Sequence, residues 1–88
     1  MKYELEIKDH LYKIFKKMEK KDKIILKIIN KKVKEILEDP QRFKPLRAPM
    51  QHMRRVHIQK HFVLLYSINE NTRKVILEEF AHHDKVYG

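Results

Sequence analysis

The chain has 88 residues, which suits one domain with a modest hydrophobic core. It contains no cysteine, which excludes disulfide bonds and thiolate metal sites, and it lacks the run of about 18 apolar residues that a membrane-spanning helix needs. Its formal net charge of +9 favours a polyanionic partner. The first ten residues carry no apolar signal core, so we expect the protein in the cytoplasm.

The first half of the chain predicts a short strand followed by two helices. Apolar side chains alternate with glutamates over residues 3–7, which is typical of a half-buried strand. Apolar residues then recur at spacings of three and four over 11–18 and again over 25–37, the pattern of amphipathic helices. Expected helix boundaries are N-caps at Asp9 and Asp22 and an end before Pro40.

The second half predicts three strands in succession. Strand-like runs occur at Met53–Ile58, Phe62–Ile68 and Lys74–Phe80, after a proline-rich basic loop. The expected order is β-α-α-β-β-β, a single α+β domain over residues 1–88. In this fold the two helices cover one face of an antiparallel sheet and leave the other face open.

Residues 40–69 contain neither Asp nor Glu. In the first strand of this basic segment, Val56 and Ile58 share one side and suit the core, which leaves Arg55 and His57 on the other side. We therefore expect an Arg and a His on the open face, where both could contact a phosphate. An ordinary solvated basic surface is the competing interpretation.

Three histidines, His57, His61 and His83, lie on or beside the expected strands. Cleavage of RNA by its own 2′-hydroxyl needs a base, an acid and cations, and imidazole suits both proton roles because its unperturbed pKa is about 6.5. Surface histidines without a catalytic role are the alternative, and no ligand spacing favours a metal. Adjacent Glu78 and Glu79 cannot both face the site from an alternating strand, and a solvated strand edge is expected for them. With one glycine the chain cannot form a Gly-rich phosphate loop, and no cofactor is expected.

The run PLRAPMQHMRRVHIQKHFVLLYSI, with HHDKVYG at the end, resembles the RelE/ParE superfamily of bacterial and archaeal toxins, above all its YafQ branch. The expected order of elements agrees with that superfamily. The chain departs from the branch at His61-Phe62, where the branch has Asp-Trp, and at Lys44, where it has His. The positions that match are Pro45, Leu46, Arg54, His57, Ile58, Leu64, Tyr66, His83 and the aromatic Tyr87.

This resemblance implies a toxin of a type II toxin–antitoxin pair. It implies an endoribonuclease that enters the ribosomal A site and cuts mRNA through the 2′-hydroxyl, without metal or cofactor. The implied partners are the ribosome, mRNA and a cognate antitoxin protein. The resemblance implies catalytic roles for His57 and His83 and a terminal aromatic role for Tyr87. With the basic segment taken into account, the expected catalytic residues are His57, His83, His61 and Arg55. The expected RNA-binding residues are Lys44, Arg47, Arg54, Lys60, Phe62 and Tyr87.

Two other functions stay open on the sequence. A ParE-like toxin would bind DNA gyrase and cut nothing, and the His57 and His83 pair argues against it. A catalytically decayed toxin would still bind RNA or its antitoxin, and the change from Asp-Trp to His61-Phe62 is compatible with that. Codon-resolved cleavage on translating ribosomes would separate the nuclease from both.

Overall fold

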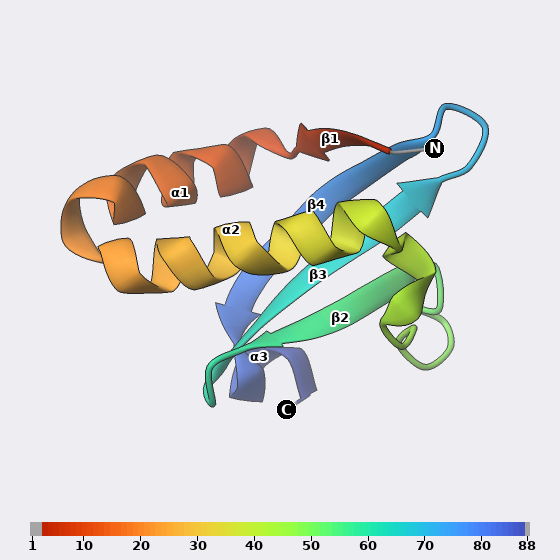
Figure 1. Cartoon of the computed structure of the whole chain (residues 1–88). Helices are drawn as coiled ribbons and strands as arrows, with labels where there is room; N and C mark the ends of the chain where they lie inside the picture. The colour runs from red at the N-terminus through yellow and green to blue at the C-terminus, as the bar shows by residue number, and fades with distance from the viewer. Residues whose placement is uncertain (1–2, 88) are drawn as a thin grey trace.

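The structure is a computed structural model that describes the backbone of residues 3–87 and the side chains of residues 3–85. The observed order confirms the α+β fold and the β-α-α-β-β-β arrangement, with a short helix added after the last strand (Figure 1). The elements are β1 (Glu4–Ile7), α1 (Asp9–Lys21), α2 (Lys23–Glu38), a 3-10 turn (Pro40–Arg42), β2 (Met53–Ile58), β3 (Phe62–Asn69), β4 (Lys74–His82) and α3 (His83–Tyr87).

The four strands form one sheet in the order β1-β4-β3-β2. The pairs β2–β3 and β3–β4 are antiparallel, as a meander requires. β1 pairs with β4 in parallel, from Glu4 opposite Lys74 to Ile7 opposite Leu77, so the sheet is mixed. The expectation of a wholly antiparallel sheet was wrong in this one pairing, because alternation within a strand does not specify the direction of its neighbour.

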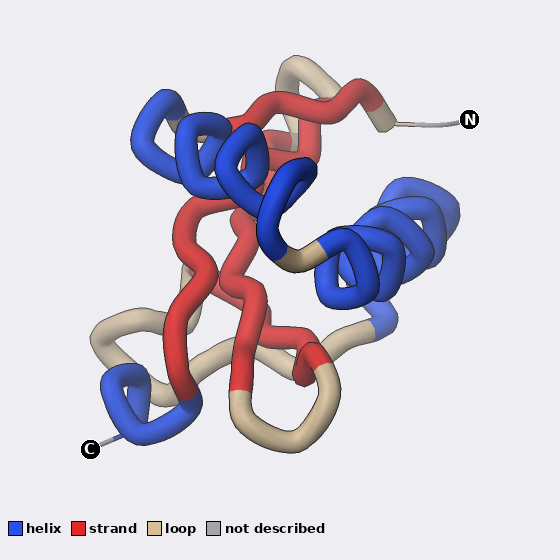
Figure 2. The backbone as a smooth tube through the Cα atoms, turned by 90° about the vertical axis from the view of Figure 1, so that its left-hand side faces the viewer, coloured by secondary structure: helices blue, strands red, loops and turns tan. Residues whose placement is uncertain are grey.

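Helices α1 and α2 form a layer over one face of the sheet (Figure 2). Asp22 lies between them and caps α2, since its side chain accepts a hydrogen bond from the amide of Ile25 at 3.4 Å. This confirms one predicted cap, whereas Lys8, not Asp9, is the N-cap of α1. Asp9 is the first residue of that helix, where its negative charge still suits the N-terminal end of the helix dipole.

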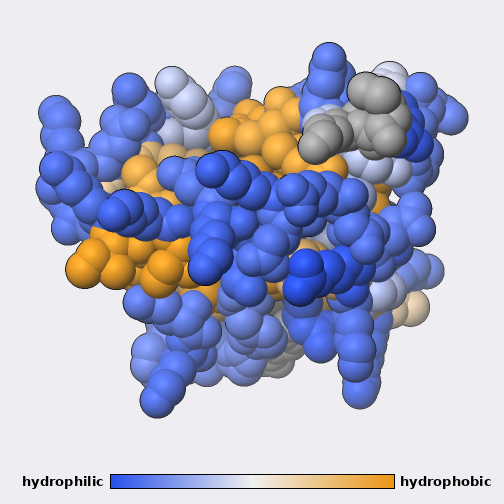
Figure 3. Space-filling model, in the orientation of Figure 1, coloured by the Kyte–Doolittle hydropathy of each residue, from blue (hydrophilic) through white to orange (hydrophobic). Residues whose placement is uncertain are grey.

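The hydrophobic core lies between the helix layer and the sheet. Both Val56 and Ile58 are buried, which confirms the predicted inward side of β2. The outer surface of the helix layer is largely hydrophilic, although apolar atoms gather near the α1–α2 turn and along the upper edge (Figure 3). Ile24, the second residue of α2, is 70% exposed. None of the helices built from described residues is long and apolar enough to cross a membrane. The fully buried side chains include Leu11, Ile29, Ile36, Ile58, Leu64, Tyr66, Val75 and Leu77.

Two side chains of the sheet hold the loop that follows α2. The hydroxyl of the buried Tyr66 donates to the carbonyl oxygen of Pro40 at 2.5 Å. Nη1 of Arg54 donates to the carbonyl oxygens of Gln41 and Phe43 at 3.2 and 2.6 Å. Burial raises the pKa of Tyr66 to about 12, and the nearby guanidinium of Arg54 opposes part of that rise. The loop is therefore fixed against β2 and β3.

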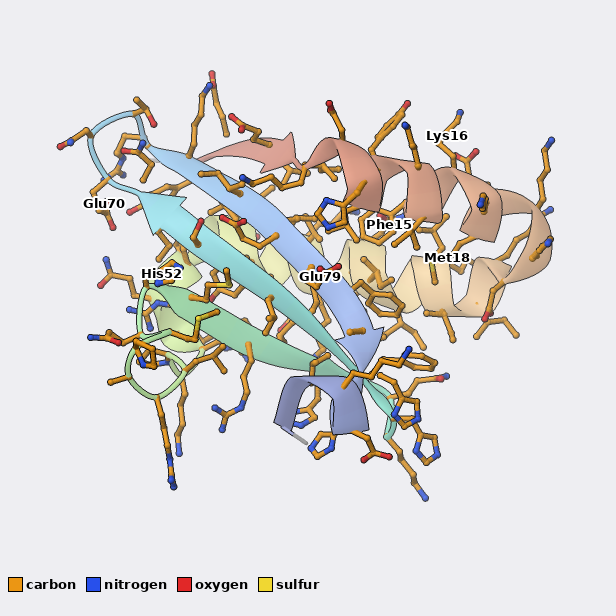
Figure 4. The ribbon with its side chains drawn as sticks, turned by 180° about the vertical axis from the view of Figure 1, so that it is seen from behind. Phe15, Lys16, Met18, His52, Glu70 and Glu79 are labelled. Carbon is orange, nitrogen blue, oxygen red and sulfur yellow. The ribbon has the colours of Figure 1, made fainter. Side chains whose placement is uncertain are left out.

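A β-bulge interrupts the pairing of β3 with β4. Leu65 pairs with Glu79, and the next residue of β3 pairs with Leu77, so Glu78 is the extra residue. Glu79 therefore lies on the open face, as Figure 4 shows, and Glu78 accepts a hydrogen bond from Ser67 on that same face at 2.6 Å. The expectation that at most one of these carboxylates could face that side was wrong, because a bulge breaks strict alternation.

Candidate functional site

The open face of the sheet is bounded at one end by α3, which lies on the side opposite to α1 and α2 (Figures 2 and 4). His57 on β2 pairs with Val63 on β3, and Val63 pairs with Ala81 on β4. These three residues form one row across the open face beside α3. Arg55 belongs to the next row, opposite Leu65.

The structure brings His57 and His83 together at this end of the sheet. Their ring centroids are 5.7 Å apart, and the ring planes are inclined by 29°. β4 ends at His82, so the chain turns into α3, and the amide of His83 donates to the carbonyl oxygen of His61 at 2.6 Å. That backbone bond joins the start of α3 to the β2–β3 turn. Two imidazoles at this separation can contact one phosphate group as acid and base.

A basic hollow of about 320 Å³ lies beside His57. The backbone amide of Arg55 donates to the carbonyl oxygen of Lys44 at 3.2 Å, which places the loop residue alongside β2. Four of the six lining residues can carry positive charge, two are apolar, and none is acidic. Such a hollow suits a phosphodiester. It is lined by Lys32, Phe43, Lys44, Arg55, Val56 and His57.

Lys32 is a site residue that sequence reasoning missed, because the lysines of α2 were interpreted as a solvated outer surface. Its side chain is partly buried, and its ammonium lies 3.8 Å from the carboxylate of Glu35. A signal was present in the sequence. Lys32 follows the buried Ile29 by three positions and precedes the buried Ile36 by four, so it borders the stripe that faces the sheet.

Two of the predicted RNA-binding residues make contacts that support the fold. Arg54 donates hydrogen bonds to the loop that follows α2, as described above. Phe62 stacks on Phe80, with ring centroids 5.2 Å apart, and packs against the core from the helix side. Neither side chain belongs to the open face, and we therefore leave both out of the proposed site.

The other predicted residues lie around the site. Lys60 and His61 belong to the β2–β3 turn, where His61 stacks with His82 rather than with His57. Arg47 is exposed in the loop before β2. The aromatic side chain of Tyr87 lies outside the described residues, so its predicted role stays a prediction. No three His, Asp or Glu side chains within the described part of the chain are placed to share a metal ion.

The carboxylates of the open face are already engaged by groups near α1. Glu78 lies 3.7 Å from the ammonium of Lys8, and Oε1 of Glu79 lies 3.2 Å from Nε2 of His10. Both pairs involve β4, whereas the basic hollow lies along β2. The β4 side of the site therefore carries paired carboxylates, and the β2 side carries cations.

Comparison with known proteins identifies the family of the chain. Residues 2–87 match the family described as ParE toxin of type II toxin-antitoxin system, parDE. A relative from Methanocaldococcus jannaschii that carries the toxin name RelE4 is 47% identical over 85 residues, which cover 97% of this chain and 90% of the relative.

Solved structures confirm the fold. One is the RelBE2 toxin–antitoxin complex of Mycobacterium tuberculosis, with a TM-score of 0.77 and 19% identity, covering 94% of this chain and all of the matched chain. Another is a mutant of the Escherichia coli toxin RelE in the free state, with a TM-score of 0.75 and 20% identity, covering 99% of this chain and 92% of the matched chain. The chain belongs to the RelE/ParE superfamily of type II toxin–antitoxin toxins.

Proposed function

We propose that this toxin is a ribosome-dependent endoribonuclease that cuts mRNA in the ribosomal A site by attack of the 2′-hydroxyl. The observation that carries the proposal is the approach of His57 to His83 on the open face, 5.7 Å between ring centroids, beside the basic hollow. Superfamily membership supports the toxin role. The arrangement of the two imidazoles and the cations supports the chemistry.

The reaction can be assigned to groups of this chain. One imidazole takes the proton of the 2′-hydroxyl, the O2′–P bond forms, and the P–O5′ bond breaks as the other imidazole protonates the leaving oxygen. The products are a 2′,3′-cyclic phosphate and a 5′-hydroxyl. Arg55 and Lys44 line the same hollow as His57, which supports assigning them the stabilisation of the negative charge that develops on the phosphorane.

The cellular setting follows from the same proposal. The formal net charge of +9 favours association with ribosomal RNA, and translated mRNA places the protein in the cytoplasm. A cognate antitoxin protein is the proposed regulator, supported by the family and by the neighbour that was solved as a toxin–antitoxin complex.

The deciding experiment is induction of the chain in a host cell, followed by mapping of mRNA 5′ ends. We expect new ends inside translated codons, and none with the double variant His57→Ala/His83→Ala. His52→Ala is the matched control, because His52 is an exposed histidine on the loop before β2, away from α3 (Figure 4). Growth arrest without new ends would contradict the proposal.

A single conservative variant tests the role of one imidazole. His83→Gln keeps a polar side chain of similar size but removes the titratable group, and it should lower cleavage on purified ribosomes about 100-fold. Undiminished cleavage by a folded His83→Gln protein would remove His83 from the mechanism.

Gyrase inhibition is the second candidate function, because the matching family carries the name of ParE. Gyrase inhibition predicts that the variants at His57 and His83 keep the effect of the toxin. A gyrase inhibitor would arrest growth and block supercoiling by purified gyrase whether or not His57 and His83 are present.

A further inference from the structure

We propose that His61 and His82 form a second RNA subsite that binds the phosphate next to the scissile one. The inference rests on the proposed function for the identity of the ligand, and it assigns a role to His82, which the sequence did not single out. It also moves His61 from the expected catalytic set to a binding subsite beside it.

The two rings form an ordered pair at the end of the sheet. Their centroids are 5.8 Å apart, and their planes are inclined by 15°. The edge of Phe62 meets the ring of His82 at 5.6 Å between centroids and 72°. Because Phe62 is itself packed against Phe80, the imidazole of His82 is held from two directions while 43% of its side chain stays exposed.

A backbone amide at the start of α3 contacts the ring of His82. The amide of Asp84 donates to Nδ1 of His82 at 3.3 Å, so this nitrogen acts as the acceptor. The carboxylate of Asp84 lies 3.8 Å from the same nitrogen, too far for a hydrogen bond. A neutral imidazole that accepts at Nδ1 carries its hydrogen on Nε2. In that form His82 presents the N–H of Nε2 to an incoming acceptor.

The second pair is continuous with the first around the end of the sheet. His82 pairs with Phe62, and Phe62 pairs with the buried Ile58, so His82 belongs to the helix-side face. His57 belongs to the open face, and the hydrogen bond from the amide of His83 to the carbonyl oxygen of His61 links the two pairs. In this proposal, an RNA strand bound at His57 and His83 curves around this end of the sheet to reach His61 and His82.

The chemistry of the surroundings favours a phosphate. Lys60 and His61 line a hollow of about 330 Å³ together with Gln59, all three from the β2–β3 turn. Imidazole N–H groups, an ammonium and an amide are donors, and a phosphodiester offers acceptors with a negative charge. Proteins that bind single strands likewise combine positive charge along the backbone path with aromatic side chains that contact bases.

The first test measures binding alone and does not depend on cleavage. A dinucleotide and a tetranucleotide of 2′-O-methyl RNA, which cannot react, are titrated into the isotope-labelled protein, and the imidazole nitrogen signals are followed. We expect both RNAs to shift His57 and His83, and only the longer one to shift His61 and His82. Shifts confined to the first pair, or no shift at all, would overturn the second subsite.

The second test uses variants. His82→Ala should weaken binding of the tetranucleotide about tenfold and leave the dinucleotide unchanged, which corresponds to the loss of one good hydrogen bond to a charged group. His61→Ala, in an exposed turn, should act in the same direction without disturbing Phe62. His52→Ala is the control and should change neither.

Cleavage on ribosomes separates this inference from the nuclease itself. His82→Ala should raise the toxin concentration needed for half-maximal cleavage and keep the maximal rate, whereas His83→Gln lowers the maximal rate. A reduced maximal rate with His82→Ala at unchanged half-saturation would contradict a binding role. Length-dependent binding through His82 in a protein that cuts nothing would retain the subsite and reject the nuclease.

Discussion

Tyr66→Phe removes one buried hydroxyl that holds the loop carrying Lys44. Its effect on the free energy of unfolding measures how much that hydroxyl stabilises the protein. The hydroxyl donates to the carbonyl oxygen of Pro40 at 2.5 Å, and the side chain is fully buried. Removing it leaves that carbonyl oxygen without this donor and keeps the ring in the core. We expect a loss of about 1–2 kcal/mol in the free energy of unfolding at pH 7.

The pH dependence gives a sharper signature. Burial raises the pKa of Tyr66 to about 12 in the folded protein, compared with about 10 in an unfolded chain. Stability from the protonated hydroxyl is therefore fully present below pH 10 and is lost as the pH rises through 12. The whole loss is about 2.7 kcal/mol, of which roughly 0.8 kcal/mol has occurred at pH 10.5. Phenylalanine does not ionise, so Tyr66→Phe has no such loss.

Urea denaturation between pH 7 and pH 10.5 measures both effects. The stability gap between the wild type and Tyr66→Phe should narrow by roughly 0.8 kcal/mol over this range. Tyr12→Phe, at an exposed tyrosine of α1, should run parallel to the wild type and controls for general alkaline effects. If the stability of Tyr66→Phe also ran parallel to that of the wild type between pH 7 and pH 10.5, the reasoning would be refuted. Tyr66 would then titrate like an exposed tyrosine.

Three further predictions concern the loop and the basic hollow. Arg54→Ala should destabilise the fold by roughly 2–3 kcal/mol, because two carbonyl oxygens of the loop lose a charged donor, while the exposed Arg47→Ala should change the melting temperature little. The affinity of the protein for ribosomes should fall steeply with salt, and a salt-independent affinity would point to contacts with protein instead. Lys32→Gln should reduce the slope of log affinity against log salt by about one at an unchanged melting temperature, and an unchanged slope would remove Lys32 from the phosphate contacts.

The helices and strands were largely predictable because their periodicity is local. The apolar stripe of α2 ends just before Pro40, and the cap at Asp22 is a property of the residues beside it. The strand β2 has the predicted bounds, and the burial of Val56 and Ile58 follows from alternation alone. Each of these features is specified by neighbours a few positions apart.

Pairings between distant segments could not be predicted in the same way. The alternation in β1 is compatible with a parallel or an antiparallel neighbour, and nothing in its four residues selects β4. The bulge at Glu78 needs the register of two strands to be known. Strict alternation is the natural assumption until that register is seen, and it gave the wrong side for one of the two glutamates.

The residues of the candidate site show the same contrast between local and long-range information. His57 was placed on the open face by alternation, which is local information. The residues alone made His83 one of three candidate histidines, and the resemblance to toxins selected it as the partner of His57, because nothing near His83 in the sequence specifies a turn back onto β2. His82 was missed for the same reason, since its contact with His61 depends on where β4 ends and how α3 begins.

Charge is distributed unevenly over the open face, and this asymmetry depends on the sequence and the fold together. Carboxylates Glu78 and Glu79 lie on the β4 side of the open face, and each is paired with a basic group at the start of α1. The β2 side carries Lys44 and Arg55 around a hollow without an acidic lining residue. Under the proposed function, the cations attract a phosphate backbone along β2, so we expect it to follow that edge towards His57. The bulge adds to the asymmetry, because it places a second carboxylate on the β4 side.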